Sequence, residues 1–339
     1  MSAGGHSVWM NGRVVPHAEA VVHFLTPALH YGAGVFEGIR CYATDSGPAV
    51  FRLGDHIERL LQSARTFGFR DLPYDADTLC AAVRELVAAN ALTECYIRPV
   101  MYLAEGGWNL TLDGGRPHVG IAVWPWTNYL GEEARERGVR ANVSSFTRHH
   151  PNVSMTKAKV VGNYANSILA KTESVRLGFD EAILLDPEGY VAECTGENIF
   201  IVRDDGDSRT PPRSLRSAGA SSPAPLRSRR ATLFTPPAAG ILDGITRQSV
   251  ITLARDAGYV VTETRLSRDD LYGADEVFVC GTAAEVIGLR EIDFRTIGSG
   301  RSGPVTRALQ HAYADAVHGR DVRSAEWLDY VTESATSVP

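Results

Sequence analysis

Lysine is nearly absent from this chain. Of its 34 basic residues only three are lysines, Lys157, Lys159 and Lys171, and the rest are arginines. Arginine forms no Schiff base with a carbonyl compound, and its pKa is too high for it to act as a base. A reaction that needs a primary amine on a side chain therefore has three candidates, all of them within residues 157–171.

Several features that mark other classes of protein are also missing. No apolar run reaches the roughly 18 residues that cross a bilayer, and the first residues lack the basic and apolar regions of a secretion signal. The five cysteines show no CxxC spacing, which argues against a disulfide scaffold or a thiolate zinc site and favours a reducing compartment. The net charge of −6 marks no nucleic-acid surface. We expect a cytoplasmic protein without a metal, a nucleic-acid partner or a membrane partner.

The length of 339 residues suggests about two domains. Apolar residues recur with a period of 3.6 from Ile57 to Phe67, so a helix is expected there, with Asp55 as its cap. The other expected elements are helices at 79–87, 163–176, 246–257 and 304–317 and strands at 95–103, 119–124, 140–146, 181–185, 198–202, 260–264 and 275–280. Because helices and strands alternate without a steady βαβ rhythm, we predict an α+β fold. Its small N-terminal domain would span 1–123, a linker 124–134, and a larger C-terminal domain 135–339.

Residues 207–230 differ from the rest of the chain. They contain six arginines, six serines and four prolines but only two large apolar residues, Leu215 and Leu226. Such a segment buries too little apolar surface to offset its ordering entropy. We expect a disordered insertion at the tip of a hairpin whose strands contain residues 201–202 and 233–234. The alternative is a site for an anionic partner such as a nucleic acid.

Two patterns suggest other chemistry but lack the context it requires. The run Gly298-Ser-Gly-Arg-Ser-Gly303 fits the glycine fingerprint of dinucleotide-binding proteins, but the residues before it are charged and not an apolar strand. His149 and His150 have no carboxylate or cysteine at metal-ligand spacing. We interpret the first pattern as a turn into a helix that starts at Pro304, and the second as a surface loop.

The segment around Lys157 and Lys159 is more informative. Both lysines lie just before an expected helix, and Gly162 allows close approach of another backbone segment. Downstream, Glu193 is a carboxylate before a strand, Gly244-Ile-Thr-Arg247 opens a helix with free N–H groups, and Gly281-Thr-Ala-Ala-Glu285 adds a hydroxyl and further N–H groups. An amine, a carboxylate and two anion cradles are what pyridoxal 5′-phosphate requires.

These segments resemble those of the branched-chain-amino-acid aminotransferases, which belong to the class IV (fold-type IV) pyridoxal-phosphate enzymes together with D-amino-acid aminotransferase. The resemblance covers nearly the whole chain outside 207–230. The matching stretches, in order along the chain, are His30-Tyr-Gly-Ala-Gly-Val-Phe-Glu-Gly-Ile-Arg40, Tyr96-Ile-Arg-Pro99, Trp124-Pro-Trp-Thr-Asn-Tyr129, Lys159-Val-Val-Gly-Asn-Tyr164, Glu193 to Phe200, Gly244 to Arg247 and Gly281 to Glu285.

The resemblance implies a role for each matching residue. Lys159 would bind the cofactor covalently and carry a proton between the substrate α-carbon and the cofactor. Lys171 lies outside the matching stretches, and its place in mid-helix among Ala170, Thr172 and Glu173 predicts a solvated residue. The other implied cofactor ligands are Glu193 at the pyridine nitrogen, Tyr164 at the phenolic oxygen, and Arg59, Ile245, Thr246 and Thr282 at the phosphate. The implied substrate-binding residues are Tyr31, Phe36, Gly38, Arg40, Tyr96, Arg98, Trp126, Tyr129, Thr282 and Ala283.

The implied reaction is transamination between leucine, isoleucine or valine and 2-oxoglutarate, in a homodimer or higher homo-oligomer whose partner subunit completes the pocket. Arg98 would meet the γ-carboxylate of glutamate, with Arg40 as the rival candidate. The loop at 105–111 departs from the family pattern, and its Trp108 would reshape the side-chain pocket. The alternatives left open are a D-amino-acid or amine transaminase and an aminodeoxychorismate lyase.

Overall fold

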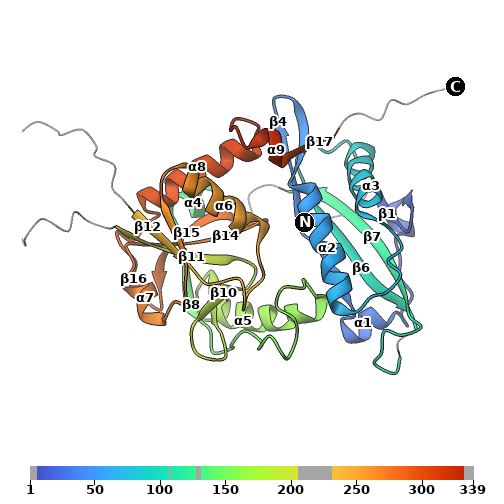
Figure 1. The fold of residues 1–339 in the computed structure, drawn as a ribbon, viewed down its shortest axis with the longest axis horizontal. Helices are drawn as coiled ribbons and strands as arrows, with labels where there is room; N and C mark the ends of the chain where they lie inside the picture. The colour runs from blue at the N-terminus through green and yellow to red at the C-terminus, as the bar shows by residue number, and fades with distance from the viewer. Residues whose placement is uncertain (1–5, 107, 127–130, 205–230, 332–339) are drawn as a thin grey trace, which may run out of the picture.

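Two β-sheets with flanking helices make up the described part of the chain (Figure 1). The computed structural model describes residues 6–106, 108–126, 131–204 and 231–331. The insertion at 207–230 and Tyr129 lie outside these ranges, so the expectations for them stay predictions. The mixed arrangement of helices and strands agrees with the expected α+β class.

The first sheet is antiparallel throughout and has the strand order β17-β5-β4-β6-β7-β1-β2, with β3 paired to β6. Its strands are β1 (Val8–Met10), β2 (Arg13–Val15), β3 (Gly34–Phe36), β4 (Ile39–Thr44), β5 (Gly47–Phe51), β6 (Cys95–Glu105), β7 (Arg116–Pro125) and β17 (Leu328–Tyr330). The helices of this half are α1 (Pro27–Tyr31), α2 (Leu53–Phe67) and α3 (Ala76–Ala89), with a 3₁₀ turn at His17–Glu19.

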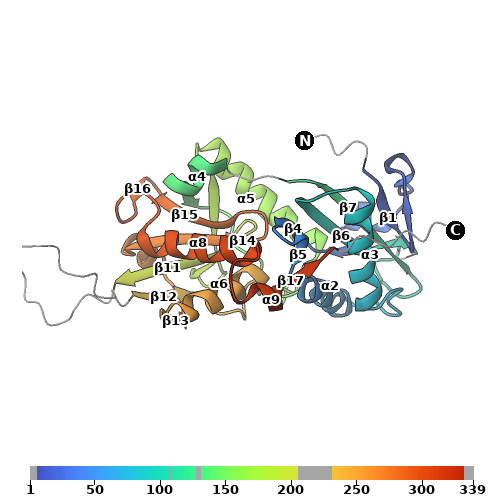
Figure 2. The same cartoon turned by 90° about the horizontal axis from the view of Figure 1, so that it is seen from above.

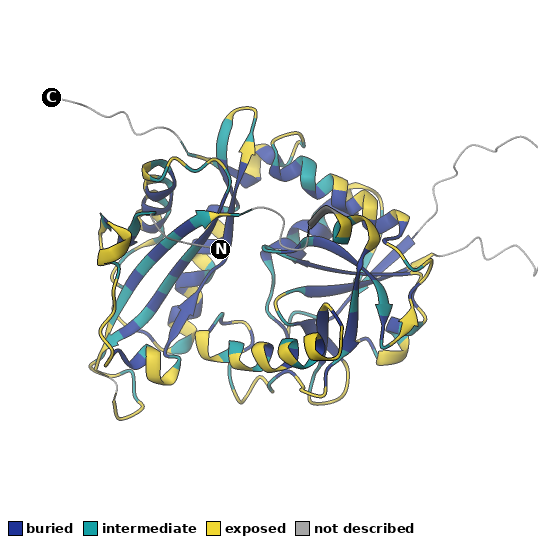
Figure 3. Ribbon diagram, turned by 180° about the vertical axis from the view of Figure 1, so that it is seen from behind, coloured by how far each residue is buried: buried dark blue, intermediate teal, exposed yellow. Residues whose placement is uncertain are grey.

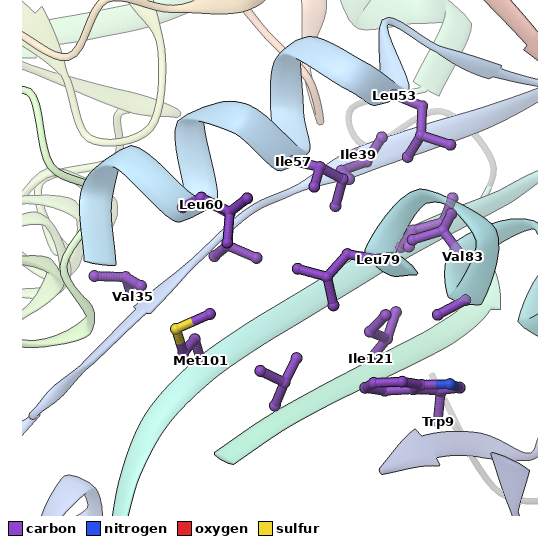
Figure 4. Packing of buried hydrophobic residues seen from close by; sticks show 14 of the residues in the cluster. Trp9, Val35, Ile39, Leu53, Ile57, Leu60, Leu79, Val83, Met101 and Ile121 are labelled. Carbon is purple, nitrogen blue, oxygen red and sulfur yellow. The ribbon is translucent and has the colours of Figure 1, made fainter. Parts of the chain in front are cut away.

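Helices α2 and α3 cover one face of this sheet (Figure 4). Leu60 of α2, Leu79 of α3 and Ile121 of β7 are fully buried in the same cluster. Each such side chain stabilises the fold by about 1.5–3 kcal/mol relative to an exposed one. This packing holds β3, β4 and β6, the strands whose other residues reach the functional site.

The second sheet is mixed, with parallel pairs between β12 and β13, β15 and β8, and β8 and β9. Its strands are β8 (Val139–Val143), β9 (Glu181–Leu185), β10 (Val191–Cys194), β11 (Asn198–Asp204), β12 (Ala231–Thr235), β13 (Val260–Glu263), β14 (Glu276–Gly281), β15 (Glu285–Ile292) and β16 (Arg295–Thr296). The helices are α4 (Gly131–Arg137), α5 (Tyr164–Arg176), α6 (Ile245–Asp256), α7 (Arg268–Tyr272), α8 (Pro304–Val317) and α9 (Ser324–Trp327), with a 3₁₀ turn at Val161–Asn163.

The two halves share a hydrophobic core. Tyr42 and Phe51 of the first sheet lie in one cluster with Phe200 and Phe278 of the second and with Tyr313 of α8. After α8 and α9 the chain returns to the first sheet, where β17 pairs with β5 (Figure 2). The central strands of both sheets are buried, whereas much of α5 is exposed (Figure 3).

The expected domain limits differ from this arrangement in two respects. Strand β7 extends to Pro125 and α4 begins at Gly131, so regular structure occupies much of the expected linker 124–134. Strand β17 belongs to the expected C-terminal domain by sequence but is an edge strand of the first sheet. Sequence patterns missed this because β17 has only three residues, too few to show a periodicity.

Candidate active site

A cavity of about 500 Å³ lies between the two sheets and is lined by residues of both. Strands β3, β6 and β7 and helix α2 supply residues to one side of it. Lys159, α5, α6 and the turns after β10 and β14 supply others. The expected site residues that line it are Phe36, Gly38, Arg59, Tyr96, Arg98, Trp126, Lys159, Tyr164, Ile245, Thr246, Thr282 and Ala283. Residues far apart in the sequence therefore converge on one chamber.

Lys159 is fixed from both sides of its backbone. Its N–H donates to Ser63 Oγ of α2 at 3.1 Å, and its carbonyl accepts the N–H of Phe36 at 3.0 Å. Its Nζ donates to Tyr164 Oη at 2.7 Å inside the cavity, whereas Lys157 is exposed. Of these two lysines, Lys159 is the one that the fold directs into the chamber.

Gly162 has the close neighbour that the sequence predicted. A Cβ atom added to Gly32, at the end of α1, would lie 2.8 Å from Gly162 Cα, closer than real Cβ contacts allow. Gly32 also has φ 65°, in the left-handed region that favours glycine. These two glycines let α1 approach the turn that follows Lys159.

Glu193 of β10 is buried and tightly held. Its Oε2 accepts the N–H of Leu242 at 3.2 Å and Nδ2 of Asn198 at 3.4 Å. Its Oε1 lies 2.7 Å from Arg148 Nε in an ion pair, yet accepts no hydrogen bond from the residues that the structure describes. Burial raises the pKa of Glu193, and the positive charge of Arg148 opposes this rise. The two carboxylate oxygens are thus held differently, Oε1 by the charge of Arg148 and Oε2 by two N–H donors.

An anion cradle forms where α6 begins. Its N-cap is Gly244, which has no side chain to satisfy the first N–H groups of the helix. A side chain on Gly244 would overlap the Asn198 amide, so this close packing admits only glycine. The N–H groups at Ile245 and Thr246 carry the partial positive charge of a helix N-terminus, and Arg59 and the Thr282 hydroxyl line the same cavity.

Arg98 is a cation surrounded by aromatic rings. Its guanidinium carbon lies 4.7 Å from the ring centre of Phe36, 5.3 Å from that of Tyr96 and 6.0 Å from that of Trp124. Nε of Arg98 is buried and has no hydrogen-bond partner among the described residues. The aromatic rings and Arg98 together form an apolar wall that contains a guanidinium. Such a wall can contact an apolar side chain through the rings and an acidic side chain through the guanidinium.

Two of the expected substrate residues lie outside the cavity. Arg40 is 2% exposed, and its guanidinium donates to Glu94 and Glu285 at 2.8 Å each. It therefore anchors the turn between β14 and β15, and the interpretation of Arg40 as a residue in the pocket is corrected. Tyr31 is exposed at the end of α1 and packs edge-on against Trp108, with 5.9 Å between the ring centres.

Lys171 is not the solvated residue that the sequence suggested. Its Nζ donates to Glu181 Oε2 at 2.5 Å on the cavity wall, next to Glu197. Burial and the charge of Glu181 raise the pKa of Glu197 to about 8. The spacing along α5 places Lys171 seven residues after Tyr164, on the same side of the helix, a signal that could have revealed it.

The glycine run at 298–303 holds no nucleotide site. The carboxylate of Glu276 accepts the N–H groups of Val305 and Thr306 at 3.0 and 2.8 Å, so a protein side chain already occupies the N-terminus of α8. Among the described residues no group of histidine, cysteine and acidic side chains is arranged to hold a metal ion. In the same ranges, no helix combines the length and apolar character needed to cross a membrane.

Comparisons with known proteins agree with this geometry. A family model described as amino-transferase class IV matches residues 34–292. The branched-chain-amino-acid aminotransferase of Pseudomonas aeruginosa is 45% identical over 324 residues, which cover 96% of this chain and 97% of that protein. The crystal structure of the branched-chain aminotransferase from Thermoproteus uzoniensis with norvaline has a TM-score of 0.85 at 41% identity, over 97% of this chain and 100% of that one. The branched-chain amino acid aminotransferase from Thermobaculum terrenum in its PLP-form has a TM-score of 0.84 at 34% identity, over 98% of this chain and 100% of that one.

Proposed function

Since the chain belongs to the class IV amino-transferase family, we propose that it is a pyridoxal-phosphate-dependent branched-chain-amino-acid aminotransferase. It transfers the amino group of leucine, isoleucine or valine to 2-oxoglutarate and forms L-glutamate. The observation that carries this proposal is the position of Lys159 Nζ in a cavity that also holds an anion cradle and is backed by a buried carboxylate. The names of its relatives support both the amino acid class and the cofactor.

The residues of the cavity fit this cofactor. Pyridoxal phosphate supplies an aldehyde that links to a primary amine and a ring that withdraws electrons from the substrate α-carbon. Glu193 Oε1, which accepts no hydrogen bond from the described residues, suits a protonated ring nitrogen. The N–H groups of Ile245 and Thr246, with Arg59 and Thr282, suit a phosphate.

The amine and its neighbours divide the proton handling. Lys159 Nζ would take the proton from the substrate α-carbon and deliver it to the C4′ carbon of the cofactor. Tyr164 Oη, 2.7 Å from that nitrogen, orients it and holds the phenolic oxygen of the cofactor. The positive charge of Arg148 opposes the burial that raises the pKa of Glu193, and an ionised Glu193 would stabilise a positive charge on the ring nitrogen.

Substrate recognition follows from the remaining walls. The N–H groups of Thr282 and Ala283, with Tyr96, bind the α-carboxylate that every substrate shares. Phe36 and Trp126 contact aliphatic side chains, and Gly38 leaves room for the Tyr96 hydroxyl, which any larger residue at 38 would displace. Arg98, held among its aromatic rings, pairs with the γ-carboxylate of glutamate.

The active form is a homodimer in the cytoplasm, and each subunit lends residues to the cavity of its partner. Phe24, Leu29 and Leu110 are 71%, 61% and 78% exposed, beside the exposed pair Tyr31 and Trp108. An apolar surface of this kind favours a protein partner over solvent. Tyr31 and Trp108 complete the side-chain pocket of the second subunit.

A half-reaction screen tests the proposed function. The purified protein loaded with pyridoxal phosphate is mixed separately with L-leucine, L-valine, L-glutamate, L-phenylalanine and D-alanine, and the visible absorbance of the cofactor is followed. L-leucine, L-valine and L-glutamate should bleach it quickly and D-alanine should not. Rapid bleaching by D-alanine alone would favour a D-amino-acid transaminase, and no bleaching by any of them would reject transamination.

A further inference from the structure

Glu37 is a charged residue in the short link between β3 and β4. It lies between Phe36 and Gly38, which both line the cavity, but Glu37 itself is not among the lining residues and is 0% exposed. Burying a carboxylate is costly unless it is paired and hydrogen-bonded. Glu37 satisfies this condition with two partners, both on α2, His56 and Arg59.

The contacts of Glu37 form a closed network. Its Oε1 accepts Nε–H of Arg59 at 2.6 Å, and its Oε2 accepts an N–H from the second terminal nitrogen, Nη2, at 2.8 Å. His56 Nδ1 lies 2.8 Å from the same Oε2. Although burial disfavours the charged form, the Arg59 guanidinium and His56 hold the pKa of Glu37 well below its usual range. Glu37 is therefore an anion with three donors around it.

We infer that Glu37 is a positioning residue, which orients the Arg59 guanidinium so that it binds the phosphate of the cofactor. This inference rests on the proposed function. A guanidinium has five N–H groups in a fixed plane. Two of them are held by Glu37, and one on Nη1 donates to the carbonyl of Asp243 at 2.8 Å, just before the anion cradle. These contacts leave one N–H on each terminal nitrogen for the phosphate.

Orientation and charge have opposite effects on phosphate binding, so the two can be separated. If Glu37 were only a counterion for Arg59, its negative charge would compete with the phosphate, and removing the charge would strengthen binding. If Glu37 sets the orientation, a glutamine at 37 would direct an NH₂ group at partners that are themselves donors. The guanidinium would then turn away from its position, and phosphate binding would weaken.

The experiment compares two ligands that differ only in the phosphate. Apoprotein with and without Glu37→Gln is titrated with pyridoxal phosphate and with pyridoxal, and the visible absorbance gives a dissociation constant for each. The ratio of the two constants, which is the phosphate preference, should fall by about tenfold or more in Glu37→Gln. The constant for pyridoxal should change by less than about twofold, because pyridoxal makes no contact with Arg59. Equal weakening of both ligands, or tighter binding of pyridoxal phosphate, would overturn the inference.

Two further variants keep the test decisive. Glu37→Asp keeps the negative charge beside Arg59 but shortens the side chain, so it should also lose the phosphate preference. This variant provides the test if Glu37→Gln fails to fold. Arg59→Gln should lose the same preference, and Glu37→Gln should add nothing to it in the double variant. A wild-type protein that takes up neither ligand would overturn the proposed function and this inference together. A wild-type phosphate preference that survives in Glu37→Gln and Glu37→Asp would overturn the inference alone.

Discussion

We propose that Arg98 serves both kinds of substrate side chain, the aliphatic and the acidic. Its guanidinium lies among the rings of Phe36, Tyr96 and Trp124, and on this proposal an aliphatic side chain would contact these rings and not the guanidinium. Arg98→Ala should reduce kcat/KM for glutamate, because a buried γ-carboxylate would be left unpaired. The reduction should correspond to a loss of about 2–4 kcal/mol in transition-state stabilisation. The kcat/KM for leucine should fall far less. Half-reaction kinetics with both amino acids measure the difference.

The control for Arg98 has to come from the same position. Arg98→Lys keeps the charge and should lose less activity with glutamate than Arg98→Ala does. Arg40→Ala is unsuitable, because Arg40 is held by Glu94 and Glu285 and its removal would leave buried carboxylates without a partner. Equal losses for leucine and glutamate in Arg98→Ala would mean that Arg98 binds the shared α-carboxylate.

Lys159 gives a second test, with a neighbouring lysine as its matched control. Lys159→Ala should bind pyridoxal phosphate without covalent attachment and show negligible turnover, because it removes the amine that lies beside Tyr164 Oη. Lys157→Ala should keep full activity because Lys157 is exposed. Borohydride reduction of the wild type followed by peptide mapping should place the label on Lys159. A label on Lys157 or Lys171 would contradict this assignment.

His149 predicts a pH dependence of stability. Burial and the neighbouring charge of Arg148 lower its pKa from 6.5 to about 4. Because the unfolded chain takes up the proton first as the pH falls, the free energy of unfolding should decrease between pH 6.5 and about 4. The pKa of His56 is also lowered, mainly by burial, so part of the slope should remain in His149→Asn. Denaturant titrations at several pH values should show that the free energy of unfolding depends less on pH in His149→Asn than in the wild type. An equal pH dependence in the two proteins would contradict the role of His149.

At the scale of elements, the hairpin of β11 and β12 predicts that the arginine-rich insertion is dispensable. Ile201 pairs with Phe234 and Asp204 pairs with Ala231, so the two strands still face each other where the described part ends. A two-residue Asn-Gly turn can close an antiparallel pair at such a position. Replacing residues 205–230 by Asn-Gly should leave the melting temperature and kcat nearly unchanged. Loss of cofactor or of the dimer in this variant would give the insertion a structural role.

How far the sequence predicts the elements depends on where their contacts lie. The strand at 181–185 and the helix at 304–317 have the expected bounds because their signals are local. Helix α2 begins at Leu53, earlier than the expected cap at Asp55, because the N–H of Arg52 donates to the carbonyl of Trp327 at 2.6 Å. No pattern near residue 52 reveals a partner so far along the chain.

The same limit applies to the site. Lys159, Glu193 and Thr246 could be proposed from the sequence because each lies in a short motif whose chemistry is local. The roles proposed for Glu37 and Arg148 could not be predicted in this way, because each contacts its site residue, Arg59 or Glu193, from another part of the chain. A carboxylate inside the apolar segment at 34–39 was the available signal for Glu37, since such a charge requires a buried cation.

At the scale of the whole molecule, the proposed dimer predicts complementation between two inactive proteins. Lys159→Ala lacks the amine of its own cavity, whereas the double variant Tyr31→Ala, Trp108→Ala lacks what each subunit lends to its partner. A mixed dimer of the two contains one cavity with both contributions intact. Subunits unfolded together and refolded as a mixture should therefore regain activity that neither parent shows. Activity equal to the mean of the two parents would place Tyr31 and Trp108 outside the partner's cavity.

The return of β17 to the first sheet has a consequence for how the protein is made. Strand β5 ends at Phe51, but its partner begins at Leu328. At about 5–20 residues per second, a ribosome needs roughly 15 to 55 seconds to synthesise the chain between them. During that time the edge of β5 stays unpaired, and an unpaired edge is a template for association with other nascent chains. The first half is thus translated early but completed late, and a chaperone that shields this edge would act during elongation, before the polypeptide is released.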